Sequence, residues 1–196
     1  MNETNRKRSS KKQSSYTSNL LLVVVFILII LLVVTAIYAS TINQNDNKPN
    51  DTGDDFSFTQ LDGSEDKLSN YRGKIVVLDM WTIWCGYCDD QIYELIEIYD
   101  IYDPEDIEIL SIDVDQRETA SDIQNFIDQT FESQGYNIEW TFGLDHNGNI
   151  WETYRGAQGG IPALCIFDKN GNLYYQHEGL ERASALAEKI DELLIS

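Results

Sequence analysis

Apolar residues follow two different periods in the middle of this chain. Residues 75–78 (I-V-V-L) form a continuous, mostly β-branched run, the pattern of a strand buried on both faces. A few positions later the apolar residues recur at helical spacing, at Ile92, Leu95, Ile96 and Tyr99. The pattern therefore predicts a buried strand that passes directly into an amphipathic helix.

The remaining patterns predict an α/β domain. Phe56 and Phe58 alternate with polar residues before a turn at 62–63, which favours a hairpin. A second buried strand is expected at 107–114, and Thr119 or Ser121 can cap the next helix. Further elements are expected at 140–142 (strand), 150–154 (short helix), 163–167 and 173–175 (strands) and 180–195 (helix). After the hairpin, we expect the order strand-helix-strand-helix-strand-strand-helix, in a mixed sheet flanked by helices.

Two cysteines stand where the predicted strand meets the predicted helix, in W-C-G-Y-C at 84–88. The first turn of a helix has unsatisfied N–H groups and a positive dipole end, so it stabilises a thiolate. A thiol pKa of about 8.5 can fall there to roughly 3.5–7.5. Cys85 and Cys88 are one turn apart and can close a disulfide, with Cys85 as the exposed attacker and Cys88 as the resolver beneath it. This arrangement predicts dithiol/disulfide exchange.

Two other interpretations of the pair stay open. A C-x-x-C is half of many zinc sites, but the remaining candidate ligands, Cys165, His146 and His177, are scattered singly, and we expect no metal. A purely structural disulfide would close a loop too short to restrain the unfolded chain much. Cys165 lies in an apolar run and is expected in the core. An odd total of three cysteines also argues against a disulfide-stapled secreted scaffold.

The segment V-L-D-M-W-T-I-W-C-G-Y-C at 77–88 resembles the active-site strand and turn of the thioredoxins. The preceding F-x-F-T-x-L-D-G and L-S-N-Y-R-G-K-I-V-V-L resemble the entry to the membrane-anchored TlpA/ResA-type branch. The resemblance covers the chain from about Phe56 to its end. It implies a thioredoxin fold with an N-terminal hairpin extension and thiol-disulfide oxidoreductase activity. It implies no cofactor beyond the redox-active disulfide of Cys85 and Cys88.

The resemblance also implies which residues hold a client protein. In the thioredoxin fold a proline after a cis peptide bond lies opposite the C-x-x-C, and the residue before it pairs with the client backbone. Pro162 and Ile161 occupy these two places. Trp84, Gly86 and Tyr87 are the other expected client contacts, and Tyr87 replaces the proline that most thioredoxins have between the cysteines. An ordinary loop proline is the alternative for Pro162.

One carboxyl group stands inside the predicted central strand, at Asp79. Buried without a partner, it would have a raised pKa and could accept the proton that Cys88 loses. Thioredoxins have an aspartate at this place, so the resemblance implies a general base. Two features depart from the family: Ile109 corresponds to a lysine of thioredoxins, and many TlpA/ResA-type proteins have Asn at the position of Asp79. The alternative is a solvated acid at the strand end.

The first 55 residues have the pattern of a membrane anchor and a tether. Residues 20–39 are apolar except for Thr35 and long enough to cross a hydrocarbon core of about 30 Å. Five basic residues and one acid precede this run, which keeps the N-terminus in the cytoplasm. A cleaved signal peptide is the alternative, and it also sends the domain outside. We expect a cytoplasmic basic tail at 1–18, a transmembrane anchor at 19–40, a flexible linker at 41–55 and a thioredoxin-like domain at 56–196.

The chain is strongly acidic, with a net charge of −19. Its first 18 residues carry +4, so −23 falls on the rest. Nucleic acid is therefore a poor partner, because its binding depends on Lys and Arg that neutralise phosphates. The acidity suits a solvated surface, and steering towards basic clients is the alternative. The expected partners are client proteins with disulfides or dithiols and, by resemblance, a membrane thiol electron carrier.

Together these patterns predict an extracytoplasmic, single-pass membrane protein that exchanges its dithiol or disulfide with clients. The resemblance to the TlpA/ResA-type branch implies that it acts as a reductase, and oxidation of a client dithiol by the reverse steps stays open. One alternative is a thiol peroxidase of the AhpC/TSA-like class. Thr82 stands three residues before Cys85, as in the T-x-x-C of peroxiredoxins, although the proline that precedes that motif is absent. The other alternative is a client-binding module without catalysis.

Overall fold

The computed structural model describes residues 27–32, 55–136 and 138–195. The chain divides into two compact units, Met1–Asn50 and Asp51–Ser196. In the first unit, residues 27–32 are helical, with exposed apolar side chains. Apart from them, the anchor expected at 19–40 lies outside the described residues, as does nearly all of the linker expected at 41–55. Within the described ranges, no helix is both long enough and apolar enough to cross a membrane.

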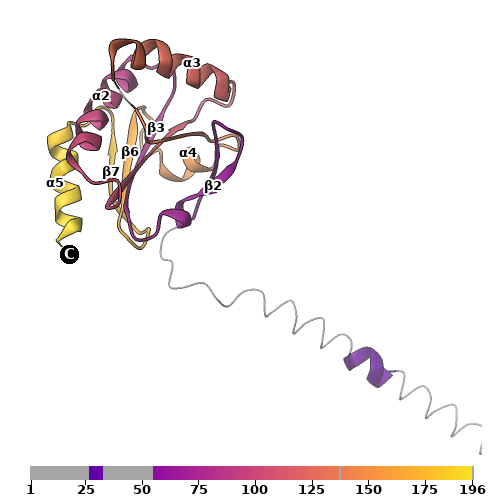
Figure 1. Ribbon diagram of the computed structural model, residues 1–196. Helices are drawn as coiled ribbons and strands as arrows, with labels where there is room; N and C mark the ends of the chain where they lie inside the picture. The colour runs from indigo at the N-terminus through magenta and orange to yellow at the C-terminus, as the bar shows by residue number, and fades with distance from the viewer. Residues whose placement is uncertain (1–26, 33–54, 137, 196) are drawn as a thin grey trace, which may run out of the picture. The chain divides into compact units, whose positions relative to one another are not determined.

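The second unit is built on a mixed sheet of seven strands, in the order β2-β1-β5-β4-β3-β6-β7 (Figure 1). β3 (Ile75–Trp81) lies among the inner strands, parallel to β4 (Ile107–Asp113) and antiparallel to β6 (Ala163–Phe167). The other strands are β1 (Ser57–Gln60), β2 (Glu65–Lys67), β5 (Thr141–Leu144) and β7 (Leu173–Glu178). The β-branched run therefore forms a strand with a hydrogen-bonded partner on each side.

Helices cover the two faces of the sheet unequally. One face packs against α2 (Gly86–Ile101), α3 (Ala120–Thr130) and α5 (Ala183–Leu194). The other face packs against α4 (Asn149–Tyr154) and the 3-10 helix η1 (Leu68–Tyr71). A second 3-10 helix, η2 (Glu132–Gln134), follows α3. Two hydrophobic cores result, one on each face of the sheet.

All seven residues of β3 are buried, so this strand contributes to both cores. Because side chains alternate along a strand, Val77 and Trp81 point towards α2, whereas Leu78 belongs to the core beneath α4. Asp79 lies between Leu78 and Met80 and therefore shares the face of Val77 and Trp81. The central strand thus directs one carboxyl group towards the helix that carries the cysteines.

The predicted hairpin, central strand and following helix are confirmed, and Thr119 rather than Ser121 caps α3. β5 and α4 confirm the strand expected at 140–142 and the short helix expected at 150–154, although the predicted order of elements counted one strand and one helix fewer than the structure has. The last helix, expected at about 180–195, is confirmed, although it starts a few residues later than expected. α5 begins at Ala183, because the backbone of Glu181 is hydrogen-bonded to the Gln91 side chain on α2 instead of to a helical partner.

Candidate active site

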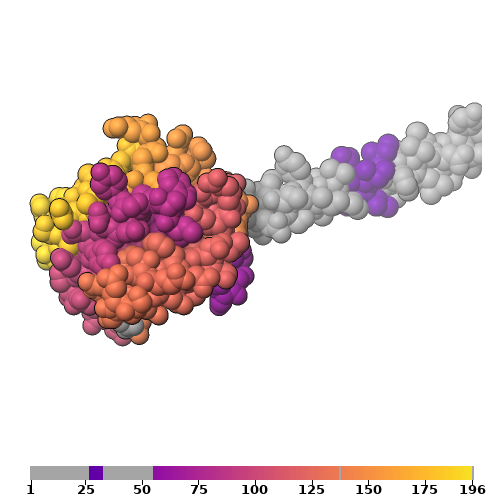
Figure 2. Space-filling view, turned by 90° about the horizontal axis from the view of Figure 1, so that it is seen from above, coloured from indigo at the N-terminus to yellow at the C-terminus, as the bar shows by residue number. Residues whose placement is uncertain are grey.

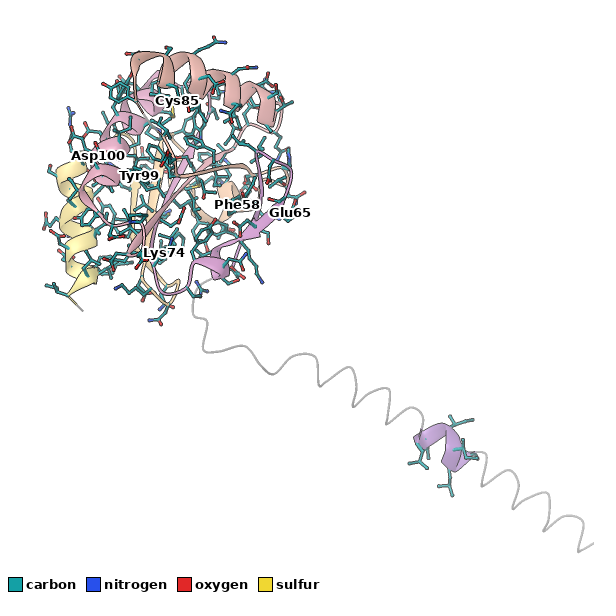
Figure 3. The ribbon with its side chains drawn as sticks, in the orientation of Figure 1. Phe58, Glu65, Lys74, Cys85, Tyr99 and Asp100 are labelled. Atoms are coloured by element: carbon teal, nitrogen blue, oxygen red, sulfur yellow. A yellow bond between two sulfur atoms is a disulfide. The ribbon has the colours of Figure 1, made fainter. Side chains whose placement is uncertain are left out.

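The strand-helix junction places both cysteines at the amino end of α2. Figure 3 labels Cys85 there. β3 ends at Trp81, and Cys85 is the N-cap residue of α2, with extended backbone. The N–H of Cys88 donates to the carbonyl of Cys85 at 2.9 Å. The two residues form a disulfide, with their Cα atoms 5.2 Å apart. Cys85 is 8% exposed and Cys88 is 0% exposed, so the Cys85 sulfur is the one that a partner protein can reach.

Exposed aromatic side chains flank the disulfide. Trp84 is 64% exposed and Tyr87 is 70% exposed, with Gly86 also exposed between them. The indole N–H of Trp84 donates to Asp115 Oδ2 at 2.8 Å, and Arg117 pairs with the same carboxylate. The bonds from Arg117 and Trp84 hold the pKa of Asp115 below its usual range, so this carboxylate stays charged. Figure 2 looks onto this end of the domain, where the magenta surface of the early α2 region lies between later segments of the chain.

A hollow of about 440 Å³ opens beside Trp84. The Ile161–Pro162 peptide bond is cis, and the N–H of Gly179 donates to the Pro162 carbonyl at 2.8 Å. Ile161, the residue before this proline, borders the hollow together with Trp84, although 77 positions separate the two in sequence. The residues that line it are Thr82, Trp84, Val114, Asp115, Gln116, Arg117, Trp151, Gly159 and Ile161.

Asp79 is wholly buried, which excludes a solvated acid at this position. The hydroxyl of Ser111 donates to Asp79 Oδ2 at 3.2 Å, and the indole N–H of Trp140 donates to the same Ser111 oxygen at 3.0 Å. Because the Trp140 N–H can only donate, the single hydroxyl hydrogen of Ser111 is left for Asp79. Burial raises the pKa of Asp79 to about 7, while the Ser111 bond acts in the opposite direction. A carboxyl group with such a pKa can exchange a proton near neutral pH.

A second buried carboxyl group lies beneath the loop that leads to Cys85. Asp113, at the end of β4, is 1% exposed, and its Oδ1 accepts the N–H of Asp115 at 2.8 Å. Burial, and then the neighbouring carboxyl of Glu118, raise the pKa of Asp113 to about 9. Glu118 in turn accepts the N–H of Ile83 at 3.2 Å. Glu118 is therefore tied to the backbone between β3 and Cys85, whereas Asp113 is tied to the backbone just after β4.

Comparison with known proteins agrees with this geometry. Residues 49–176 match the AhpC/TSA family. The chain belongs to the AhpC/TSA family. A relative in this comparison, the thiol-disulfide oxidoreductase ResA of Bacillus thuringiensis subsp. konkukian, is 26% identical over 138 residues, 70% of this chain and 74% of ResA. The ResA of Geobacillus kaustophilus is 29% identical over 122 residues, which cover 62% of this chain and 64% of that ResA.

Solved structures of similar proteins have the same fold as this AhpC/TSA-family chain. The exposed lipoprotein thioredoxin Etrx1 of Streptococcus pneumoniae gives a TM-score of 0.59 at 26% identity, covering 71% of this chain and 100% of Etrx1. StoA of Bacillus subtilis gives a TM-score of 0.55 at 18% identity, covering 71% of this chain and 98% of StoA, a likeness of fold. The protein is a thiol-disulfide oxidoreductase with a thioredoxin-like fold.

Three groups near the site of this AhpC/TSA-family chain were not predicted from the sequence: Ser111 with Trp140, the pair Asp113 and Glu118, and Glu178. Ser111 left a usable signal, because it is a lone hydroxyl in an otherwise apolar stretch of β4 that runs parallel to β3. Glu178 left no usable signal in the sequence, because its hydrogen bonds to the loop at 158–159 depend on how that loop folds beside β7.

The other candidate ligands lie apart from the cysteine pair. Cys165 packs in the core beneath α4, on the opposite face of the sheet, and burial raises the pKa of its thiol to about 12. His146 is exposed, and His177 Nδ1 lies 3.2 Å from a carboxylate oxygen of Glu181. Across the described ranges, no group of three or more His, Cys, Asp or Glu side chains is arranged to hold a metal ion.

Proposed function

We propose that this oxidoreductase is a membrane-anchored reductase of client proteins outside the cytoplasm, with Cys85 as the attacking sulfur. The observation that carries the proposal is the disulfide at the amino end of α2, where Cys85 reaches the surface and Cys88 lies buried behind it. The dipole of α2 favours a thiolate at this end. The reduced pair supplies two electrons, so no further cofactor or metal enters the reaction.

In the first step, the Cys85 thiolate attacks a disulfide of the client. A bond forms between the Cys85 sulfur and one client sulfur, the client S–S bond breaks, and the other client sulfur leaves as a thiolate. The client backbone pairs beside Ile161 and Pro162, and its side chains pack on Trp84, Gly86 and Tyr87. The shared hollow of Ile161 and Trp84 supports this placement.

In the second step, Cys88 resolves the mixed disulfide. Its thiol gives a proton to Asp79, its sulfur attacks the Cys85 sulfur, and the second client thiolate is released. The client has gained two electrons and the pair is a disulfide, as in the structure. Burial of Asp79 on the α2 face of β3 supports its role as the base. The same steps in reverse would oxidise a client dithiol.

The location of this chemistry follows from the amino-terminal pattern. An apolar span at 19–40 behind a basic tail anchors the chain, and the linker at 41–55 holds the domain near the outer surface of the membrane. A membrane thiol carrier then reduces the Cys85–Cys88 disulfide by the same exchange. Clients are proteins with a disulfide or dithiol, and nucleic acid is not among the partners because the chain is so acidic.

The deciding experiment is the equilibrium potential of the pair. The purified full-length protein is titrated against dithiothreitol or glutathione, and its thiols are counted by mass tagging. A potential near about −270 mV supports the reductase, whereas one near about −120 mV would make the protein an oxidant. If Cys85 and Cys88 do not interconvert as a pair, the proposed function is wrong.

A further inference from the structure

We infer that Glu178 is a positioning residue for client binding, because its carboxylate holds the loop that presents Ile161 to the client. Glu178 lies at the end of β7, where its Cα is paired with that of Ala163, the first residue of β6. The inference rests on the proposed function, in which the client pairs beside Ile161. It adds the residue that fixes where Ile161 stands.

The carboxylate of Glu178 is directed at the backbone of the loop. Its Oε1 accepts the N–H of Gln158 at 2.9 Å and the N–H of Gly159 at 2.7 Å, and its Oε2 lies 3.2 Å from the Gln158 nitrogen. Two successive N–H groups that converge on one anion form a concave site, and hydrogen bonds to a charged acceptor are stronger than neutral ones. A single side chain therefore fixes two consecutive peptide groups.

The loop is shaped around this carboxylate. It runs from the end of α4 at Tyr154 to the start of β6 at Ala163, and two of its glycines have positive φ, Gly156 at 80° and Gly159 at 69°. A Cβ atom on Gly156 would lie 2.7 Å from the carboxyl carbon of Glu178. A side chain at position 156 would therefore displace the Glu178 carboxylate from its present place against the loop.

This loop also forms one side of the hollow beside the cysteines. Gly159 and Ile161 line the hollow together with Trp84, the residue directly before Cys85. A client that reaches the Cys85 sulfur while its backbone pairs with Ile161 must fit the distance between these two walls. A displaced Ile161 would no longer pair with the client backbone while the client rests on Trp84, so the client would bind more weakly.

Glu178 acts on the loop, whereas Cys85, Cys88 and Asp79 belong to α2 and β3. The loss of its carboxylate should therefore weaken the binding of a protein client without changing the chemistry of the dithiol. A role in fold stability alone would instead lower all activities together. The two roles can be separated by comparing a large and a small disulfide substrate.

The test uses the full-length protein with insulin as the protein disulfide and 5,5′-dithiobis(2-nitrobenzoate) as the small disulfide. We expect Glu178→Ala to raise the KM for insulin by about tenfold, with little change in kcat. The rate with the small disulfide and the potential of the pair should match those of the wild type. Glu178→Gln, which keeps the Oε1 acceptor, should recover most of the affinity. Glu188→Ala, an exposed acid on α5, is the matched control.

The outcomes distinguish this inference from the proposed function. Glu178 is not a positioning residue if folded Glu178→Ala keeps the wild-type KM for insulin. The same conclusion follows if the reduction rates of insulin and of the small disulfide fall by the same factor. If the alanine variant does not fold, Glu178→Asp decides, because its shorter side chain withdraws the carboxylate from the loop: a raised KM for insulin supports the inference, and an unchanged KM overturns it. If the wild type reduces the small disulfide but not insulin, client reduction itself fails and the inference falls with it.

Discussion

Ser111 donates a hydrogen bond to the buried carboxyl group of Asp79 across the parallel pairing of β4 and β3, at an oxygen-oxygen distance of 3.2 Å. The indole of Trp140 directs that bond, because its N–H donates to the Ser111 oxygen and leaves the hydroxyl hydrogen for Asp79. Within the part of the chain that the structure describes, the partner of the buried acid is a neutral hydroxyl and not a charged side chain. The position that corresponds to a lysine of thioredoxins is Ile109, which is buried in the core.

Removal of the Ser111 hydroxyl should shift the pH dependence of the resolving step. The Ser111 bond lowers the pKa of Asp79, so Ser111→Ala should raise this pKa and move the rising limb of the rate profile to higher pH. For a shift of one pH unit the ionised fraction of Asp79 at pH 7, and with it the resolving rate, would fall by about fivefold. The measurement is the single-turnover rate of client release against pH. Trp140→Phe, which frees the hydroxyl to rotate, should give a smaller shift in the same direction. If the rate profile of Ser111→Ala is identical to that of the wild type, Asp79 is not the base whose pKa Ser111 lowers.

Replacement of Asp79 should stabilise the fold at high pH. Its pKa is about 7 in the folded protein, above the ordinary value of 3.8, so the folded state binds the extra proton. Stability from this group is therefore present below about pH 4 and is lost as pH rises to about 7. Asp79→Asn should match the wild type near pH 4 and exceed it by a few kcal/mol at pH 8. Urea unfolding of the oxidised proteins at both pH values measures this, and an equal difference at the two values would contradict it.

The two cysteines should differ when they are replaced singly. Cys85→Ala should abolish the reduction of a protein disulfide, because the buried Cys88 cannot reach the client. Cys88→Ser should instead accumulate a mixed disulfide between Cys85 and the client, which mass spectrometry detects. A mixed disulfide between the client and Cys88 in the Cys85→Ala variant, with none on Cys85 in Cys88→Ser, would reverse the assignment of attacker and resolver.

The same Cys88→Ser variant tests peroxide reduction. Thr82 is buried three residues before Cys85, and its hydroxyl oxygen has no hydrogen-bond partner in the described residues. A peroxidase would use the Cys85 thiolate to break the peroxide O–O bond, forming a sulfenic acid and releasing water. We expect no peroxide consumption by reduced Cys88→Ser beyond the rate of a free thiol. Rapid consumption would establish the peroxidase instead.

The cap of α3 offers a test of stability away from the site. The Thr119 hydroxyl accepts the N–H of Asp122, and the Asp122 carboxylate accepts the N–H of Thr119, a reciprocal capping box. Thr119→Ala should lower the free energy of unfolding by about 1 kcal/mol. Ser121→Ala, at an exposed position inside the same helix, is the matched control and should change it little. Equal effects of the two changes would show that Thr119 is not the cap.

Several parts of the site could be predicted from the sequence because their signals are local. The run at 75–78 predicted β3, the switch to helical spacing predicted α2, and the cysteines fall at the junction of the two. The position of Asp79 inside an apolar strand predicted that the pKa of its carboxyl group is raised. Each of these inferences needs only neighbouring residues, since strand and helix periods are set by the backbone.

The partners of these residues were decided by the tertiary structure. Ser111 is 32 positions from Asp79 and reaches it because β3 and β4 pair in a register that places them side by side. Ile161 meets Trp84 at one hollow, and Glu178 holds the Ile161 loop, because β6 and β7 fold back beside β3. By itself the sequence determined which groups can react and on which element each one lies. The fold alone decided which groups touch, because contacts between distant segments depend on strand register and loop path, which no local pattern encodes.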